Sequence, residues 1–274
     1  DESSDDYKSS DLSSIVTHFF GDSFARGSYL EGSSSEVMLP FLATALTRIG
    51  SSVDGQMKDV LDPIKTSAIK SQSLRDLYKK KNGEEIKTFL TEMDPGESVV
   101  IPTGWQGHAT YLELVKSEDG DGFSVKHFNL GGGCNEHQDS IYDAQKGQYC
   151  YFPYTLQKGV SIDKLINPIF MTGFKELKDS SSGKQKKMDH EDSNALLSML
   201  GPMSKMSETK ASDHQVIQYA GLCSWHSLNA MLKDKCSEAD YANYYMRIGL
   251  DVIYAFHHHL QENLQLESLS NLDV

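Results

Sequence analysis

The stretch QYAGLCSWHSLNAML, residues 218–232, places a cysteine at the expected start of an apolar helix. A free thiol has a pKa of about 8.5 and is mostly protonated at neutral pH, but the unpaired N–H groups and the dipole of a helix start favour its anion. Gly221 lets the backbone bend just before Cys223. The side-chain amide of Gln218, together with the Cys223 N–H, is suited to hold an oxyanion. These residue types predict a nucleophilic thiolate, although a cysteine taken alone is more often a small buried hydrophobe.

A thiolate catalyst needs an imidazole within reach, and the imidazole needs a group that orients it. His108 begins an expected strand after GWQG, and Asn129 lies near the end of the strand that returns. In the right hairpin register Asn129 is a cross-strand or diagonal neighbour of His108, whereas a slip of one residue sends it to the other face. Alone, the two are more typical of a packing or surface histidine and a turn asparagine. Together with Cys223 they predict a Cys–His–Asn set.

Helices are expected to precede these strands. Residues 34–50 carry apolar side chains at helical spacing, with Ser35 as a cap and Gly50 as a stop. Two or three shorter helices follow, interrupted at Pro63 and at Asn82–Gly83. The helical region, residues 13–94, is expected to form either a separate subdomain or the first layer of the main domain.

Strands are expected next, because the apolar pattern changes after residue 94. Short strands are predicted at 99–101, 108–116, 123–130 and 148–156, and a further strand or short helix at 167–177. The turn-rich SEDGDG joins the second strand to the third as a β-hairpin. Strands that are followed by helices indicate an α+β fold, with a small antiparallel sheet packed on helices.

The sequence also predicts how the chain is divided. The acidic, serine-rich residues 1–12 are expected to be disordered. Residues 95–274 are expected to form the catalytic domain, with helices at 224–235 and 238–262 at its end. The polar segment 178–214 is expected to be a surface insertion, since a loop of that length is unusual unless it is functional or mobile.

Composition excludes several classes of function. The net charge of −13 argues against nucleic acid as a partner and favours a partner with a basic face. No apolar run is long enough to span a membrane. The cysteines are too few and too widely spaced for a disulfide scaffold, so reduced thiols in a cytosol-like compartment are expected, with two disulfides as the alternative. They are Cys134, Cys150, Cys223 and Cys236.

The cysteine stretch resembles the cysteine box of the Josephin-type deubiquitinases, in which a glutamine precedes the cysteine and a histidine follows it. The resemblance implies that Gln218 holds the oxyanion, that Cys223 is the nucleophile and that His226 is structural. The stretches GHATYLELV and FSVKHFNLGG resemble the histidine and asparagine strands of the papain-like fold. That likeness implies His108 as the general base and Asn129 as its orienter.

The order of these residues departs from Josephin and papain, in which the cysteine comes first. Histidine, then amide or acid, then cysteine is the order of the SUMO-protease-like clan, which resembles a circular permutation of the same fold. That clan includes bacterial effector deubiquitinases and effector acetyltransferases. Ala109 stands where the Josephin and SUMO-protease groups often have tryptophan, and Ser224 stands where the clan usually has glycine. The resemblance covers about a sixth of the chain.

The resemblance implies a thiol protease or isopeptidase whose substrate is ubiquitin or a ubiquitin-like protein, without a cofactor, and an effector that an intracellular pathogen sends into a host cell. Trp105, Gly131, Gly132 and Trp225 are the expected substrate-binding residues, with the glycines leaving room for a narrow C-terminal tail. An acyl- or acetyltransferase, a deamidase or transglutaminase, and a non-catalytic binding module are the alternatives.

A zinc site is a further alternative. Cys134 and His137, like Cys223 and His226, are separated by two residues, which is metal-ligand spacing. One pair lies in a glycine-rich loop and the other opens a helix, and no short-range signature joins them. The sequence therefore favours thiol chemistry without a metal.

Overall fold

The structure, a computed structural model, describes residues 35–50, 55–105, 108–131, 133–134, 138–181, 189–204, 214–216 and 223–264. The leader predicted to be disordered, residues 1–12, lies outside these ranges. Within them the chain forms helices and two antiparallel sheets, so the predicted α+β class is confirmed. None of the described helices is both long and apolar enough to cross a membrane.

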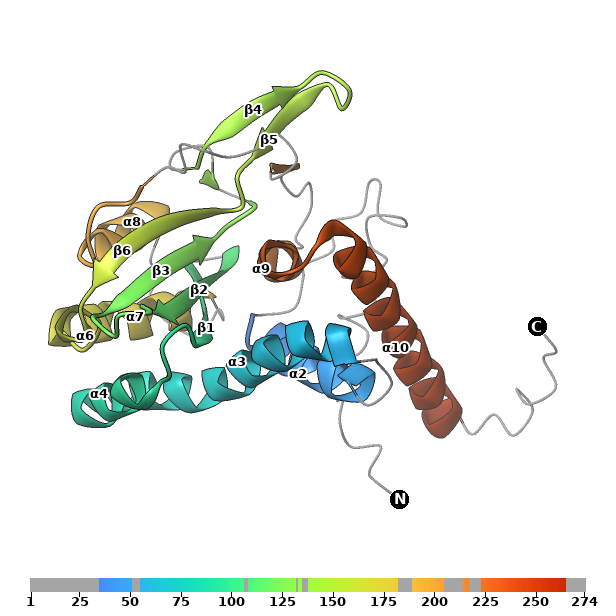
Figure 1. Ribbon diagram of the computed structural model, residues 1–274, viewed down its shortest axis with the longest axis horizontal. Helices are drawn as coiled ribbons and strands as arrows, with labels where there is room; N and C mark the ends of the chain where they lie inside the picture. Colours follow the sequence, from blue (N-terminus) through green and yellow to red (C-terminus); the bar gives the residue numbers. More distant parts are fainter. Residues whose placement is uncertain are drawn as a thin grey trace.

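The larger sheet holds four strands in the order β1-β2-β3-β6, each antiparallel to its neighbour (Figure 1). The predicted hairpin is confirmed, and Tyr111 lies opposite Phe128 in its register. The consecutive strands β1, β2 and β3 pair side by side through short connections and form a meander, whereas β6 joins β3 after the chain has passed through β4 and β5 of the other sheet. The strands are β1 (Ser98–Trp105), β2 (His108–Lys116), β3 (Phe123–Phe128) and β6 (Tyr154–Val160).

A second, smaller sheet has the order β4-β5-β7. The single strand predicted at 148–156 is in fact two strands in different sheets, because β5 ends at Tyr151 and β6 begins at Tyr154. Pro153 lies between them and has no N–H to donate to a ladder, so the chain leaves one sheet there and enters the other. The strands of this sheet are β4 (Ser140–Asp143), β5 (Gln148–Tyr151) and β7 (Gln215–Val216).

The N-terminal helices are α2 (Ser35–Gly50), α3 (Gly55–Lys80) and α4 (Gly83–Glu92). The break predicted at Pro63 is wrong, since α3 continues through it. An internal proline costs a helix about 3 kcal/mol. Leu61 and Ile64 beside it are each 1% exposed. Burying each such side chain stabilises the fold by roughly 2 kcal/mol and so offsets the cost of the proline. The break at Asn82 is confirmed, where the side chain caps α4 by accepting a hydrogen bond from the Glu85 N–H.

The remaining helices include a part of the chain that was expected to be a surface insertion. Asp189 caps α8 through a reciprocal pair of bonds with Asp192, and Leu196 and Leu197 of this helix are buried. The prediction of a surface insertion at 178–214 is therefore wrong for α8. The capping box starts this helix, and its apolar face packs against the rest of the protein. These helices are α6 (Ile162–Leu165), α7 (Pro168–Ser181), α8 (His190–Ser198), α9 (Cys223–Lys235) and α10 (Glu238–Leu264).

Helices cover both faces of the larger sheet, and each face has its own hydrophobic core. On one face α2, α9 and α10 pack with Tyr111 and Phe128 of the sheet. On the other face α4, α7 and α8 pack with Leu112 and Leu114. Leu42 of α2 belongs to the same core as Leu228 of α9. The described N-terminal helices are thus a layer of the main body and not a separate subdomain.

Candidate active site

The sulfur of Cys223 lies against the first residues of strand β2. The described helix α9 begins at Cys223, as the sequence predicted. Its Sγ accepts a hydrogen bond from the Ala109 N–H, with 3.2 Å between nitrogen and sulfur. This hydrogen bond ties the start of α9 to the start of β2. Cys223 and Ala109, which are 114 positions apart in the sequence, are therefore in contact, and Ala109 directly follows His108.

The register of the hairpin brings Asn129 to His108. The pairing of Leu112 with His127 and of Leu114 with Val125 continues toward the end of the hairpin, where it makes Asn129 the diagonal neighbour of His108 on the same face. Nε2 of His108 lies 2.8 Å from Oδ1 of Asn129. The slip of one residue that would have separated them does not occur.

A backbone group fixes which ring nitrogen of His108 carries the proton. Oδ1 of Asn129 also accepts a hydrogen bond from the Gly131 N–H at 3.0 Å. The atom there must be an acceptor, so Nε2 of His108 donates to it and Nδ1 of the neutral ring is left as the base. The backbone carbonyl of Asn129 accepts a bond of 2.5 Å from the side-chain amide of Gln138, which holds the same residue from a second direction.

Burial keeps the His108 imidazole neutral. The residue is 7% exposed and Asn129 is 4% exposed. Burial lowers the pKa of His108 below the ordinary 6.5, the bond to Asn129 opposes that shift, and His190 adds to it. Around neutral pH the ring is therefore largely unprotonated and able to accept a proton.

An indole ring covers the imidazole. Trp105 pairs with His108 across the β1–β2 hairpin, and their ring centroids are 4.5 Å apart. The β1 backbone at Gly104 also lies very close to β2, because a Cβ on Gly104 would lie 2.1 Å from the His108 carbonyl oxygen. Gly104 has a φ of +145°, which side chains rarely adopt. Glycine at this position lets β1 approach His108 and Ala109, and the N–H of Ala109 binds the Cys223 sulfur.

Ion pairs anchor the far end of α9 to the sheet. Lys126 of β3 pairs with Asp234 at 2.5 Å, and the buried Glu113 of β2 pairs with Lys235. Burial alone would lower the pKa of Lys126, but the carboxylates of Asp234 and Glu113 raise it above its ordinary value. These pairs lie on the face that Ala109 and Tyr111 share, so they help to fix the helix that carries Cys223.

The structure brings His108 into contact with Asn129 and Trp105, and it places the Cys223 sulfur against the N–H of Ala109, the residue after His108. Gly131 takes part through its N–H, whereas Gln218 and Gly132 lie outside the described residues. Trp225 does not fit the expected substrate-binding role. It is 3% exposed and packs in the core 6.1 Å from the Tyr245 ring, because it follows Cys223 by two positions and points into the body.

Sequence reasoning missed two residues of this region, Gln138 and His190. The Asp189–Asp192 capping pattern before the apolar cluster of α8 was a signal that a helix starts there, with His190 in its first turn. The bond from Gln138 to the Asn129 carbonyl had no signal in the sequence, because it depends on how the glycine-rich loop folds back.

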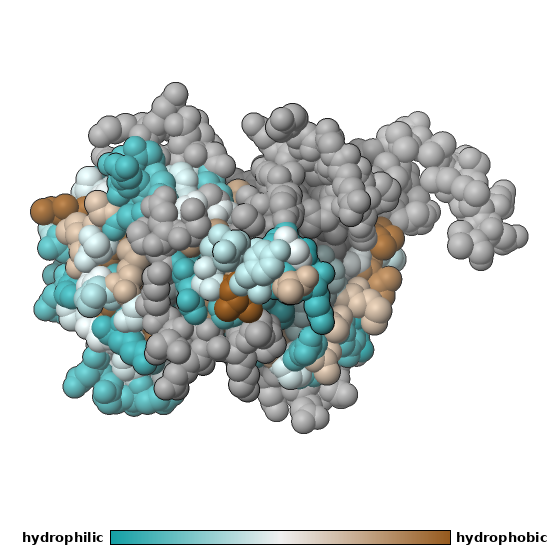
Figure 2. Space-filling model, turned by 90° about the horizontal axis from the view of Figure 1, so that it is seen from above, coloured by the Kyte–Doolittle hydropathy of each residue, from teal (hydrophilic) through white to brown (hydrophobic). Residues whose placement is uncertain are grey.

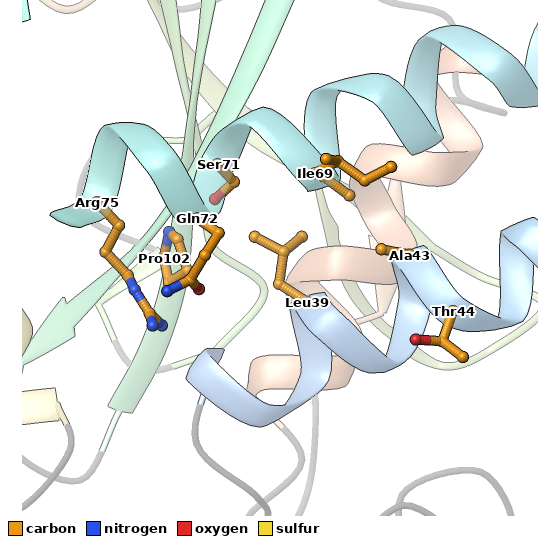
Figure 3. Close-up of a pocket in the computed structure, with 9 residues that line it drawn as sticks. Leu39, Ala43, Thr44, Ile69, Ser71, Gln72, Arg75 and Pro102 are labelled. Atoms are coloured by element: carbon orange, nitrogen blue, oxygen red, sulfur yellow. The ribbon is translucent and has the colours of Figure 1, made fainter. Parts of the chain in front are cut away.

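Other features of the described residues do not form a second centre. Among them no group of three or more His, Cys, Asp or Glu side chains is arranged to hold a metal. Cys134 is 3% exposed, and His137 lies outside the described residues. A cavity of about 410 Å³ lies between α2 and α3, with Leu39, Ile69 and Arg75 among its lining residues (Figure 3). It contains no member of the Cys–His–Asn set.

Comparison with known proteins gives a similarity in fold. No protein-family model matches the chain, and no curated protein matches it in sequence. Among solved structures, that of the Legionella effector AnkH is similar, with a TM-score of 0.57 and 14% sequence identity. The match covers 94% of this chain and 54% of the AnkH chain, so this chain spans about half the length of that protein.

Proposed function

We propose that this chain is a cysteine hydrolase with a permuted papain-like fold, which cleaves a peptide or isopeptide bond. The observation that carries the proposal is the meeting of Cys223 with the start of β2. Its Sγ lies 3.2 Å from the Ala109 nitrogen, and the preceding residue, His108, is bonded to Asn129. A thiol, an imidazole base and an amide that orients the base are the parts such a reaction requires.

In the acylation step, Sγ of Cys223 attacks the carbonyl carbon of the substrate while its proton passes to Nδ1 of His108. The carbonyl electron pair becomes an oxyanion, which the Cys223 N–H and the Gln218 amide are proposed to hold. When the oxyanion collapses, the C–N bond breaks and the amine leaves with the proton from His108. The product of this step is a thioester on Cys223.

In the deacylation step, water attacks the thioester while His108 takes one of its protons. The C–S bond breaks, the sulfur recovers the proton from His108, and a carboxylic acid is released. Asn129 holds the ring through both transfers, because its oxygen accepts from Nε2 and leaves Nδ1 free to exchange protons. No oxidant, reductant or cofactor is required.

Ubiquitin or a ubiquitin-like protein is the proposed substrate, on the Josephin resemblance of the cysteine stretch. The net charge of −13 suits a substrate with a basic face. On the face seen in Figure 2, hydrophilic residues predominate among the coloured atoms and the hydrophobic ones form small separate groups. Because the similar Legionella protein is described as an effector, we extend the proposal to an effector that acts in the reducing cytosol of a host cell.

The test is incubation with ubiquitin-like proteins that carry an electrophile at the C-terminus. The wild type is expected to form a covalent adduct that Cys223→Ala and His108→Ala abolish. Cys236→Ala is the matched control, because burial first, and Asp240 second, raise the pKa of Cys236 to about 11 and make it a poor nucleophile at neutral pH. This variant is expected to react like the wild type.

Failure to form an adduct with any modifier tested would end the ubiquitin-like assignment. A Cys223 that reacts with a small alkylating agent equally well in the wild type and in His108→Ala would end the hydrolase proposal itself. In that case the sulfur and the imidazole would not act together.

A further inference from the structure

His190 reaches the candidate active site through the Trp105 ring. It is the first residue of α8, in the segment expected from the sequence to be a surface insertion. The Trp105 ring lies 4.5 Å from the His108 ring and 4.8 Å from the His190 ring, measured between centroids. Trp105 is 8% exposed, so the indole contacts both imidazoles and has little access to water.

The position of the His190 ring is fixed from several sides. A Cβ on Gly133 would lie 2.1 Å from Nε2 of His190, so the loop that follows Asn129 touches the ring directly. The Asn194 amide nitrogen lies 3.1 Å from the same nitrogen. The Asp189 cap sets where α8 starts, and its buried leucines hold the helix on the body. His190 is therefore half-buried, and its ring is held in place by the residues around it.

These contacts place His190 against both neighbours of the His108–Asn129 hydrogen bond. One neighbour is Trp105, which covers the imidazole, and the other is the glycine-rich loop whose Gly131 N–H also binds Oδ1 of Asn129. A hydrogen bond that water cannot reach keeps its geometry better and is electrostatically stronger than an exposed one. Loss of the His190 ring would leave the indole without support on that side.

We propose that His190 is a positioning residue for Cys223 and His108, which presses Trp105 against the His108 ring and keeps water from the His108–Asn129 bond. The inference rests on the proposed function, because it assigns His190 to the same site. His190 acts by packing, and it does not touch the reacting atoms. Among the described residues, His190 of α8 acts electrostatically on His108, and Cys223 of α9 binds the N–H of the next residue, Ala109, whereas Trp105 and Asn129 are uncharged.

The experiment compares the wild type with His190→Ala and His190→Phe by two measurements. The first is the pKa of His108, followed by NMR of its ring proton, with the buried His127 that contacts Thr110 as internal reference. The second is the rate at which iodoacetamide alkylates Cys223 near neutral pH, followed by peptide mass spectrometry. Neither measurement needs an acyl substrate.

In His190→Ala the pKa of His108 is expected to rise toward that of an exposed histidine, because water enters beside the ring. Alkylation of Cys223 is expected to slow by roughly five- to tenfold. His190→Phe is expected to stay within about twofold of the wild type, since a phenyl ring can still support the indole. The His127 resonance is expected to be unchanged in both variants.

Gly133→Ala provides a second route, because its Cβ would displace the His190 ring without removing it. It is expected to change both measurements in the same direction as His190→Ala. Wild-type values in His190→Ala and in Gly133→Ala would overturn the inference. It would also be overturned if His190→Phe behaved like His190→Ala, since charge and not packing would then be responsible.

The same data separate this inference from the proposed function. If His108→Ala slows alkylation of Cys223 and His190→Ala does not, only the role of His190 is lost. If His108→Ala leaves alkylation unchanged, the catalytic pair itself is lost, whatever His190 does to the His108 ring.

Discussion

Asn129 is hydrogen-bonded through its side-chain oxygen, its backbone carbonyl and its backbone N–H. Its side-chain oxygen accepts from His108 and from the Gly131 N–H. Its backbone carbonyl accepts from Gln138, and its N–H donates to the Pro153 carbonyl at 3.1 Å. A residue held in this way can fix the orientation of the imidazole, which is the task that the proposed reaction gives it.

Replacing Asn129 tests that task. Asn129→Ala removes the shared acceptor, so His108 loses its orientation and the rate of adduct formation is expected to fall roughly 10- to 100-fold. Asn129→Asp keeps an acceptor for both donors, and we expect it to retain activity within about tenfold of the wild type. Initial rates with the ubiquitin-like electrophile measure both. Equal losses in the two variants would contradict an orienting role.

The pH dependence follows from the buried ring of His108. Its pKa lies below 6.5, chiefly because burial disfavours the charged form. The neutral base therefore persists at lower pH than it would for an exposed histidine, and the acid limb of the pH–rate profile is expected to have its midpoint below 6.5. A depressed pKa also means that the contribution of His108 to stability is present above the unfolded-state value and is lost as pH falls through the folded value.

Rates of adduct formation between mildly acidic and neutral pH measure this midpoint, and chemical denaturation at the same pH values measures the stability. A midpoint above that of an ordinary histidine would contradict the prediction. Asn129→Asp is the matched control, because a carboxylate beside Nε2 is expected to move the midpoint upward.

At this scale the sequence indicated Cys223, His108 and Asn129, because thiol chemistry requires those residue types and helix and strand starts are visible in local patterns. It did not indicate that Trp225 is buried in the core or that His190 lies behind Trp105. Those placements depend on how α9 and α8 pack against the body, and no local pattern records that packing.

Among the elements, the β1–β2 hairpin brings the site together. Its last pairs, Gly104 with Ala109 and Trp105 with His108, bring the donor to Cys223 and the indole to the imidazole. A side chain at Gly104 would separate the strands at Ala109, the residue whose N–H binds the sulfur.

Gly104→Ala is therefore expected to lower stability by roughly 3 kcal/mol or more, since a backbone clash is added to an unfavourable φ. It is also expected to slow alkylation of Cys223. Gly120→Ala is the matched control: Gly120 has a φ of +78° in another turn of the same sheet, with nothing within 4 Å of its added Cβ. It is expected to cost about 1 kcal/mol and to leave alkylation unchanged.

Thermal melts of both variants and alkylation rates at one temperature make the comparison. A Gly104→Ala protein whose Cys223 reacts at the wild-type rate would show that the close approach of the strands does not matter for the sulfur.

The elements themselves were largely predictable where a side-chain period dominates. The strands at 108–116 and 123–130 and the helices at 34–50, 224–235 and 238–262 agree with β2, β3, α2, α9 and α10 to within a few residues. The errors fall where tertiary contacts override local preference. Pro63 is carried inside α3 by burial of its neighbours, and the short strands β4 and β7 lack an apolar period of their own.

For the molecule as a whole, the helices before the sheet and the helix that carries Cys223 share one hydrophobic core. Leu42 of α2 is fully buried in that core with residues of α9 and α10. Both tryptophans of the chain, Trp105 and Trp225, lie outside the N-terminal helices. Their fluorescence thus reports on the sheet and on α9.

Leu42→Ala is expected to lower the stability of the whole unit by roughly 2–5 kcal/mol, because it leaves a cavity in the shared core. The tryptophan-detected and far-UV transitions are expected to shift together. Ile69→Ala is the control, since Ile69 is 54% exposed, and it is expected to change stability by less than about 0.5 kcal/mol. A tryptophan transition unmoved by Leu42→Ala would mean that the N-terminal helices unfold independently.

The hydrogen bond between His108 and Asn129 joins residues 21 positions apart, whereas the one from Ala109 to the sulfur spans 114. A ribosome adds about 5–20 residues per second, so it delivers the nucleophile roughly ten seconds after the hairpin. Under the proposed chemistry, the nascent chain during that interval contains His108 and Asn129 but not yet the Cys223 thiol that they would activate. On that proposal, a chain that terminates before α9 lacks the nucleophile and is expected to show no hydrolase activity.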